Sequence, residues 1–225
     1  MTLKERVINS LIRSILDLFC KIDKRDLNKI PLKGPAILIT NHVTTLEGPL
    51  FYVNLRPRKT IAMAKAELFD KFFTRTILST WGAIPVKRGA ADMQAMKKCF
   101  NVLEEGNFLC IAPEGTRSKD GKLLRGKAGT TFIATQKKVP IIPMVHWGII
   151  DLKTNSRKLK RTDVQIKVGR PFYVEKKEEG RINSEDRQNM ADEMMYQIAI
   201  YLPEELRGYY SDLSKATTNY ITFTD

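Results

Sequence analysis

Two residues near the start of the chain have the types and the spacing for proton transfer. His42 is one of only two histidines, and Glu47 follows it five positions later. Both come after the apolar run 36–40, which is typical of a buried strand. Residues five apart do not share a face of a regular helix, so the acid reaches the imidazole only if the chain curls between them. In that arrangement Glu47 fixes the imidazole tautomer and His42 acts as a general base.

A second interpretation of this stretch stays open, in which it is a capping loop around a buried, hydrogen-bonded histidine. Asn41, Thr44 and Thr45 carry the kinds of side chain that cap helices. The other histidine, His146, follows the apolar run 141–145 and is more typical of a structural residue than of a catalytic one.

A Glu-Gly-Thr-Arg turn at residues 114–117 follows another apolar run, 108–112. Gly115 permits a positive φ and close approach of the backbone, and Arg117 offers a planar fork that suits a phosphate group. Taken alone, the motif is equally compatible with an ordinary glycine turn and a solvated arginine. Taken with His42, it indicates chemistry on an alcohol carried by a phosphorylated molecule.

Two further stretches are basic and rich in glycine. Arg88 follows the short apolar run 83–86 and is a candidate second phosphate ligand, or else a solvated strand end. Residues 121–128 nearly match a nucleotide-binding P-loop, but Ala128 replaces the Ser or Thr whose hydroxyl holds Mg²⁺. We therefore expect no ATP or GTP site.

Charge and composition narrow the class of partner. The chain has 225 residues and a formal net charge of +13, which indicates an anionic partner. A basic block between residues 153 and 161 fits a solvated loop, an anionic lipid surface or nucleic acid. No recognised nucleic-acid motif accompanies the charge, so we expect no nucleic-acid partner. Three widely spaced cysteines without metal or redox spacing indicate structural thiols in a reduced compartment.

The apolar runs alternate with helical patterns along the chain, among them a helix expected over residues 68–79, which predicts an α/β fold. We expect a single-domain sandwich in which helices cover both faces of a mostly parallel sheet. Active sites in such sheets gather at the carboxyl ends of strands, where both motifs fall. Residues 31–225 form this domain. Residues 1–30 form an N-terminal amphipathic helical segment, because apolar residues recur every three or four positions between 3 and 20. That helix either packs on the core or lies in a membrane interface.

Four blocks in this order resemble those of the glycerolipid acyltransferase family, and in particular its bacterial 1-acylglycerol-3-phosphate acyltransferases. They are Asn-His-x4-Glu at 41–47, Val-Lys-Arg-Gly at 86–89, Pro-Glu-Gly-Thr-Arg-Ser at 113–118 and Val-Pro-Ile-Ile-Pro at 139–143. The resemblance covers about residues 36 to 175 and includes the stretches 64–68 and 124–129.

The resemblance implies a reaction. His42, oriented by Glu47, would deprotonate the sn-2 hydroxyl of a 1-acylglycerol 3-phosphate, and the alkoxide would attack an acyl thioester to give phosphatidic acid. The donor would be acyl-CoA or acyl carrier protein. No metal or other cofactor is needed, because the thioester is already activated.

The resemblance also assigns the binding residues and the location. The residues that would hold or shape the site of the acceptor phosphate are Arg88, Arg117, Glu114, Gly115, Thr116 and, more weakly, Lys65. Pro143 would line the acyl path. The N-terminal helix would dock the protein peripherally on the anionic, cytoplasmic face of a membrane.

One departure from the family pattern bears on the substrate. Most members have Asp where this chain has Glu47. Because Glu is one methylene longer, its backbone must lie farther from the imidazole than that of Asp. Alternative acceptors are therefore another lysophospholipid or glycerol 3-phosphate. A catalytically silent membrane-binding module is the alternative from a different class.

Overall fold

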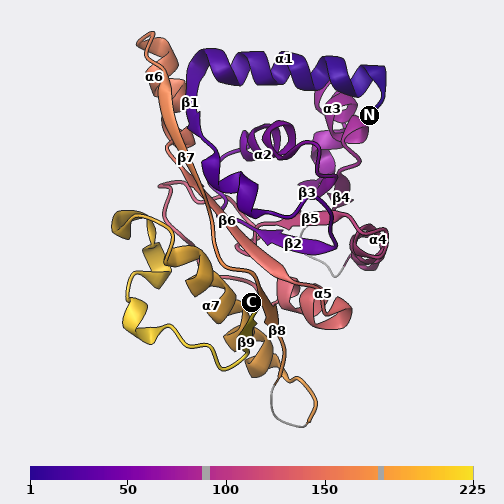
Figure 1. Ribbon diagram of the computed structural model, residues 1–225, viewed down its shortest axis with the longest axis vertical. Coiled ribbons are helices and arrows are strands. Elements are labelled where there is room, and N and C mark those ends of the chain that lie inside the picture. The colour runs from indigo at the N-terminus through magenta and orange to yellow at the C-terminus, as the bar shows by residue number, and fades with distance from the viewer. Residues whose placement is uncertain (88–91, 177–179, 225) are drawn as a thin grey trace.

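A largely parallel sheet forms the centre of the protein (Figure 1). The computed structural model describes residues 1–87, 92–176 and 180–224. Its strands are β1 (Cys20–Asp23), β2 (Ala36–Ile39), β3 (Thr60–Lys65), β4 (Ile84–Val86), β5 (Phe108–Ile111), β6 (Ile141–Trp147), β7 (Thr162–Val168), β8 (Phe172–Val174) and β9 (Ile221–Phe223).

The strands run in the order β1-β7-β6-β2-β5-β3-β4, and β8 joins β6 to β9 outside this path. The pairs from β6 through β2, β5 and β3 to β4 are parallel, as is β1 with β7, whereas β6 pairs antiparallel with β7 and β8. All four residues of β2 and of β5 are buried. This burial explains their continuous apolar runs, since strands covered on both faces have no polar side.

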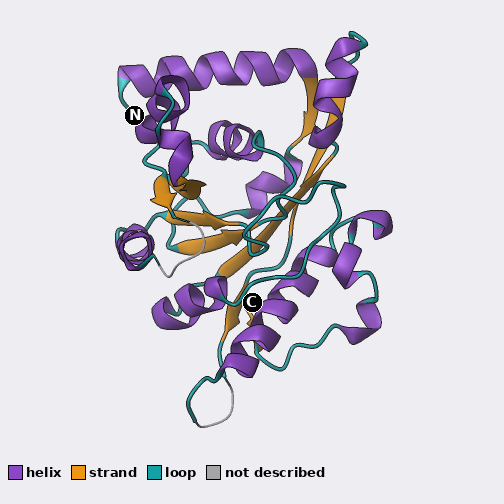
Figure 2. Cartoon of the chain, turned by 180° about the vertical axis from the view of Figure 1, so that it is seen from behind, coloured by secondary structure: helices purple, strands orange, loops and turns teal. Residues whose placement is uncertain are grey.

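Helices cover both faces of the sheet, as the views from front and back show (Figures 1 and 2). They are α1 (Leu3–Phe19), α2 (Glu47–Leu55), α3 (Phe72–Thr80), α4 (Met93–Glu104), α5 (Gly129–Lys137), α6 (Leu152–Arg157) and α7 (Ser184–Ala199). Residues of α4, α5 and α7 pack into one apolar core. Residues of α1 and α2 pack into a second core on the other face. The expected α/β sandwich with a mostly parallel sheet is confirmed.

Short 3₁₀ turns occupy several of the connections between these elements. They span Arg25–Lys29, Ala66–Phe69, Ile149–Asp151, Glu204–Leu206, Gly208–Tyr210 and Leu213–Lys215.

Helix α1 packs on the protein through Glu5, Asn9 and Leu16 and exposes apolar residues on its outer face. Glu5 and Asn9 are buried, whereas Leu3 and Leu11 are 77% and 62% exposed. The buried polar groups are paired: Oε1 of Glu5 accepts a hydrogen bond of 2.9 Å from the Tyr52 hydroxyl, and Asn9 accepts one of 2.9 Å from the Trp81 indole. The helix therefore packs on the core through one face, and its other face is exposed; the membrane-interface interpretation stays a prediction.

Three local predictions differ from the structure. Residues 20–23, expected within the helical segment, form strand β1, which pairs with β7 and joins that segment to the sheet. The helix expected over 68–79 begins at Phe72, because the Thr74 hydroxyl and the Arg75 guanidinium bind the carbonyls of Leu68 and Phe69. The strand expected over 141–145 continues to residue 147.

Candidate active site

His42 lies just beyond the carboxyl end of β2, where its backbone is held by neighbouring strands. The Asn41 side chain bridges to β6, donating 2.9 Å to the carbonyl of His146 and accepting 3.0 Å from its amide. The Thr40 amide donates 3.1 Å to the carbonyl of Ile111 at the end of β5. These bonds fix the path of the backbone from the end of β2 to His42.

Glu47 is the first residue of α2 and pairs directly with His42. Its Oε2 lies 2.5 Å from Nδ1 of His42. Its Oε1 accepts the amides of Val43 and Thr44 at 2.5 and 2.6 Å. Residues 43–46 thus curl over the carboxylate, which is the arrangement that the five-residue spacing requires. The pairing favours a proton on Nδ1 and leaves the Nε2 lone pair of His42 to accept one.

Glu114 supports His42 from the other side. Its Oε1 accepts the His42 amide at 2.7 Å, and its Oε2 accepts the Leu124 amide at 2.8 Å. The Ser118 amide donates 2.8 Å to the His42 carbonyl. Glu114 is only 1% exposed, and burial raises its pKa to about 7 against the lowering effect of the two amide donors. Glu114 therefore positions the backbone of the candidate base.

The turn at residues 114–117 places Arg117 near His42, since both side chains line the same cavity. Gly115 has φ +65°, a left-handed conformation that favours glycine. Thr116 and Arg117 are exposed. The turn therefore presents a guanidinium to the cavity that His42 also lines.

Lys127 is a cation at this turn that the sequence analysis did not select. A Cβ added at Gly115 would lie 3.1 Å from its Cδ and 3.4 Å from its Nζ. Its amide donates 2.9 Å to the carbonyl of Pro113. The glycines of residues 121–129 were the only sequence feature near Lys127. They do not indicate that this lysine packs beside Gly115.

A cavity of about 260 Å³ opens beside the His42–Glu47 pair. Its mouth includes Arg117 and Lys65, the last residue of β3, which also forms a 3.0 Å ion pair with Glu67. Its deeper walls are apolar and come from α2, β3, α3 and the adjoining loops. The bulky members of this wall are Phe51, Tyr52, Met63, Leu68, Leu78 and Trp81.

The sequence analysis missed this wall, because aromatic residues at helical spacing look like ordinary core residues. The structure does not bring Pro143 to it. Pro143 lies in β6 opposite Ile39 of β2, and β5 separates β2 from the strand β3 that lines the cavity. Arg88, the other candidate phosphate ligand, lies outside the residues that the structure describes.

His146 is fully buried behind Glu47. Its Nε2 lies 3.3 Å from the carbonyl oxygen of Asn41 and 3.6 Å from Oε1 of Glu47. Its ring meets Phe51 edge to face, with 5.2 Å between centroids. Burial lowers the pKa of His146, which favours the neutral imidazole. The sequence predicted a structural histidine, and only the fold reveals its contact with the candidate catalytic acid.

Together, the parallel sheet, the His42–Glu47 pair at its carboxyl edge and the neighbouring apolar cavity define an α/β protein with the layout of a general-base enzyme. Comparison with known families gives the class a name. The chain belongs to the acyltransferase family, whose model matches residues 21–147.

Similar individual proteins agree with this assignment. A 1-acyl-sn-glycerol-3-phosphate acyltransferase from Cocos nucifera is 32% identical over 153 residues, which are 66% of this chain and 49% of that protein. One from Streptococcus pneumoniae is 28% identical over 191 residues, covering 82% and 67% of the two chains. The chain spans about half the length of the plant relatives.

A solved structure is similar in fold. The crystal structure of the 1-acyl-sn-glycerophosphate acyltransferase PlsC from Thermotoga maritima aligns with a TM-score of 0.62 and 23% identity. The alignment covers 84% of this chain and 76% of that one. At this level of identity the likeness shows the shared fold.

Proposed function

We propose that this protein transfers a fatty acyl group from an acyl thioester to the sn-2 hydroxyl of 1-acylglycerol 3-phosphate, giving phosphatidic acid. The observation that carries the proposal is the 2.5 Å contact between Nδ1 of His42 and Glu47, at the mouth of an apolar cavity that Arg117 also lines. The similar proteins are 1-acyl-sn-glycerol-3-phosphate acyltransferases, which supports the same reaction.

In the proposed mechanism His42 is the general base. Its Nε2 takes the proton of the acceptor hydroxyl while the oxygen attacks the thioester carbonyl, and Glu47 stabilises the imidazolium that forms. The tetrahedral intermediate then collapses, the carbon–sulfur bond breaks, and the imidazolium returns its proton to the leaving thiolate. We propose acyl-CoA or acyl carrier protein as the donor, and no metal or other cofactor.

The acceptor phosphate is proposed to bind at the turn of residues 114–117. Arg117 supplies the guanidinium, because its planar fork matches phosphate oxygens, and Lys127 adds a second charge next to Gly115. Lys65 lines the same cavity and is proposed as a weaker contributor. Thr116 and Gly115 shape the turn. Arg88 is kept as a proposed ligand from the family resemblance alone.

The acyl chain is proposed to occupy the cavity that Tyr52 and Trp81 line. This replaces the acyl path expected at Pro143. The same two aromatic side chains hydrogen-bond to Glu5 and Asn9 on the inner face of α1. Helix α1 is therefore attached to the cavity wall.

The outer face of α1 is proposed to lie in the interface of a membrane. Its exposed apolar residues fall on one stripe, namely Leu3, Val7, Leu11, Ile15 and Leu18. Such a stripe on a helix whose opposite face packs on the protein is typical of interfacial docking. In the part of the chain that the structure describes, no helix combines the length and apolarity needed to cross a membrane. We propose peripheral docking on the cytoplasmic face.

The test is turnover of lysophosphatidic acid with acyl-CoA and with acyl carrier protein, followed by mass spectrometry of the lipid products. His42→Ala is expected to lose roughly 10²–10⁴-fold in kcat. Lys119→Gln, at an exposed position near the turn of residues 114–117, is the control and should retain activity. Equal rates for wild type and His42→Ala would contradict the mechanism.

The same assay separates the alternatives. Turnover of glycerol 3-phosphate or another lysophospholipid in place of lysophosphatidic acid would change the acceptor and leave the chemistry intact. Vesicle binding without turnover of any of these acceptors would instead indicate a silent membrane-binding module.

A further inference from the structure

The turn between α6 and β7 exposes a leucine among cations. We call residues 153–161 the α6–β7 tip. Leu159 is 96% exposed and has φ +52°. The exposed cations on either side of it are Lys153, Arg157, Lys158 and Lys160. The tip therefore combines an apolar side chain with a cluster of cations, which is the combination of groups that an anionic lipid surface attracts.

The tip is an ordered turn. Amides of Lys158 and Lys160 both donate 2.9 Å to the carbonyl of Asn155, and the amide of Leu159 donates 3.1 Å to that of Ser156. These bonds fix the left-handed backbone at Leu159. Its side chain is therefore presented to the outside by local hydrogen bonding.

The tip is also joined to α1. The Arg161 guanidinium donates to the carbonyls of Asp17 and Cys20 at 2.7 and 2.5 Å, satisfying acceptors at the end of that helix. Strand β1, which continues from α1, pairs with β7 from Cys20 and Thr162 onward. Figures 1 and 2 both place α6 at the same end of the molecule as α1. The tip and α1 are therefore joined both by the Arg161 side chain and by the pairing of β1 with β7.

We propose that the α6–β7 tip is a second membrane contact, specific for anionic lipid, which acts together with α1. The cations bind headgroup phosphates, and Leu159 enters the interfacial region between them. Nucleic acid would also attract the charge, but it offers no apolar surface for Leu159 or for the stripe on α1. The proposal rests on the proposed function only in that the lipid substrate lies in that membrane.

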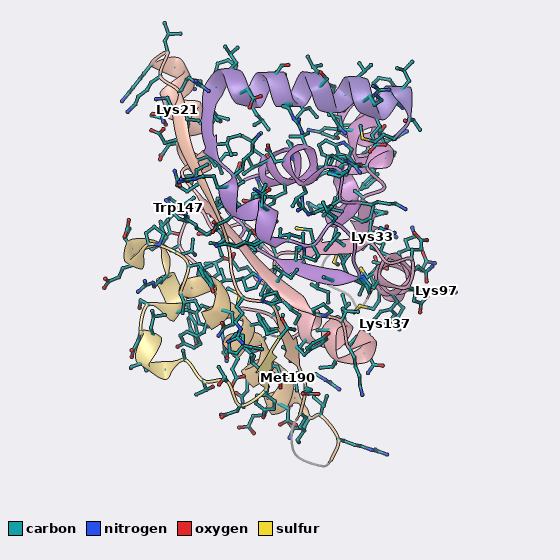
Figure 3. The ribbon with its side chains drawn as sticks, viewed as in Figure 1. Lys21, Lys33, Lys97, Lys137, Trp147 and Met190 are labelled. Carbon is teal, nitrogen blue, oxygen red and sulfur yellow. The ribbon has the colours of Figure 1, made fainter. Side chains whose placement is uncertain are left out.

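The first test is partitioning onto vesicles of phosphatidylcholine alone and of phosphatidylcholine mixed with phosphatidylglycerol. Lys158→Gln with Lys160→Gln is expected to weaken binding to the anionic vesicles about 30-fold, from roughly fivefold for each lysine near such a surface. The matched control is Lys97→Gln with Lys98→Gln. It removes the same charge from exposed positions of α4, which lies away from α1 and α6 (Figure 3).

Only the tip variant should lose this affinity, and the difference should shrink with added salt. Equal losses in the two variants would overturn the proposal, because net charge alone would then explain the binding. Tighter binding of the tip to duplex DNA than to anionic vesicles would overturn it as well.

The second test asks whether Leu159 enters the lipid. The native cysteines Cys20, Cys99 and Cys110 are buried, so a dye sensitive to polarity can be attached selectively to the Leu159→Cys variant. A blue shift on anionic vesicles supports insertion, and an unchanged spectrum on vesicles that bind the protein would refute it. Tip variants should keep wild-type turnover of substrate dispersed in detergent, so this outcome is separate from that of the catalytic proposal.

Discussion

Oε1 of Glu47 lies 3.6 Å from Nε2 of the buried His146, on the side of the carboxylate away from His42. The same nitrogen lies 3.3 Å from the Asn41 carbonyl. Both neighbours are acceptors, and burial lowers the pKa of His146, so the imidazole is neutral with its proton on Nε2. The N–H of His146 therefore lies beside the carboxylate that pairs with His42.

Replacing His146 by phenylalanine keeps the ring against Phe51 but removes Nε2. We expect kcat to fall about tenfold with little change in KM, which corresponds to one weak contact to a charged group. Val145→Ala, at a buried position of the same strand, should lower stability without lowering kcat. The effect of His146→Phe should also shrink in a Glu47→Asp background, where the shorter acid is farther from Nε2; full additivity would argue against this coupling.

Glu47→Gln tests the charge of the acid and Glu47→Asp tests its length. The amide cannot stabilise an imidazolium. With its oxygen accepting the Val43 and Thr44 amides, it would also turn its NH₂ group towards Nδ1 of His42, so kcat is expected to fall roughly 10²–10⁴-fold. Glu47→Asp keeps the charge and should retain more activity. Steady-state kinetics on purified proteins gives both numbers. A glutamine variant as active as the aspartate variant would be inconsistent with the assigned role.

Arg117→Lys tests recognition of the acceptor phosphate. Lysine keeps the charge but loses the bidentate fork, so KM for lysophosphatidic acid should rise about tenfold while KM for the acyl donor stays unchanged. Lys119→Gln removes an exposed charge two residues later and serves as the control. An equal rise of both KM values would indicate damage to the turn instead.

Glu114 predicts a pH dependence of stability. Its carboxyl has a pKa of about 7 in the folded protein, above the ordinary value near 4.5. Between these values the folded state binds more protons than the unfolded state, so its stability falls as pH rises from about 4.5 to 7. The loss assigned to this group is on the order of 3 kcal/mol.

Urea unfolding at several pH values checks this. The free energy of unfolding of wild type should decline across that window, whereas Glu114→Gln should show a flatter profile and a lower stability in acid, because its amide cannot accept from both backbone N–H groups. Parallel profiles for the two proteins would show that Glu114 does not titrate there.

Gly115→Ala tests the left-handed turn. An L-residue at φ +65° costs about 1–2 kcal/mol, and the new Cβ would press on Lys127. We expect lower thermal stability and a higher KM for the acceptor. Gly129→Ala is the control: it starts α5, where an added Cβ meets nothing within 4 Å, and it should be neutral or mildly stabilising. Equal effects at both glycines would contradict the role of the turn.

The sequence alone determined the fold class and the two motifs of the site. The apolar runs of β2 and β5 are local signals, because strands buried on both faces need apolar residues at every position. His42 and Glu47 are close in the chain, so their pairing follows from a short curl. Such features depend on neighbours within a few residues.

The tertiary structure decided which distant residues complete the site. His146 reaches Glu47 because β6 pairs with β2. Tyr52 and Trp81 come from different elements, stack in one cavity wall and both hydrogen-bond to α1. The stripe on α1 is free because that helix packs through its other face, where Glu5, Asn9 and Leu16 are buried. Periodicity finds an apolar face, but the face that packs is decided by contacts between residues far apart in the chain.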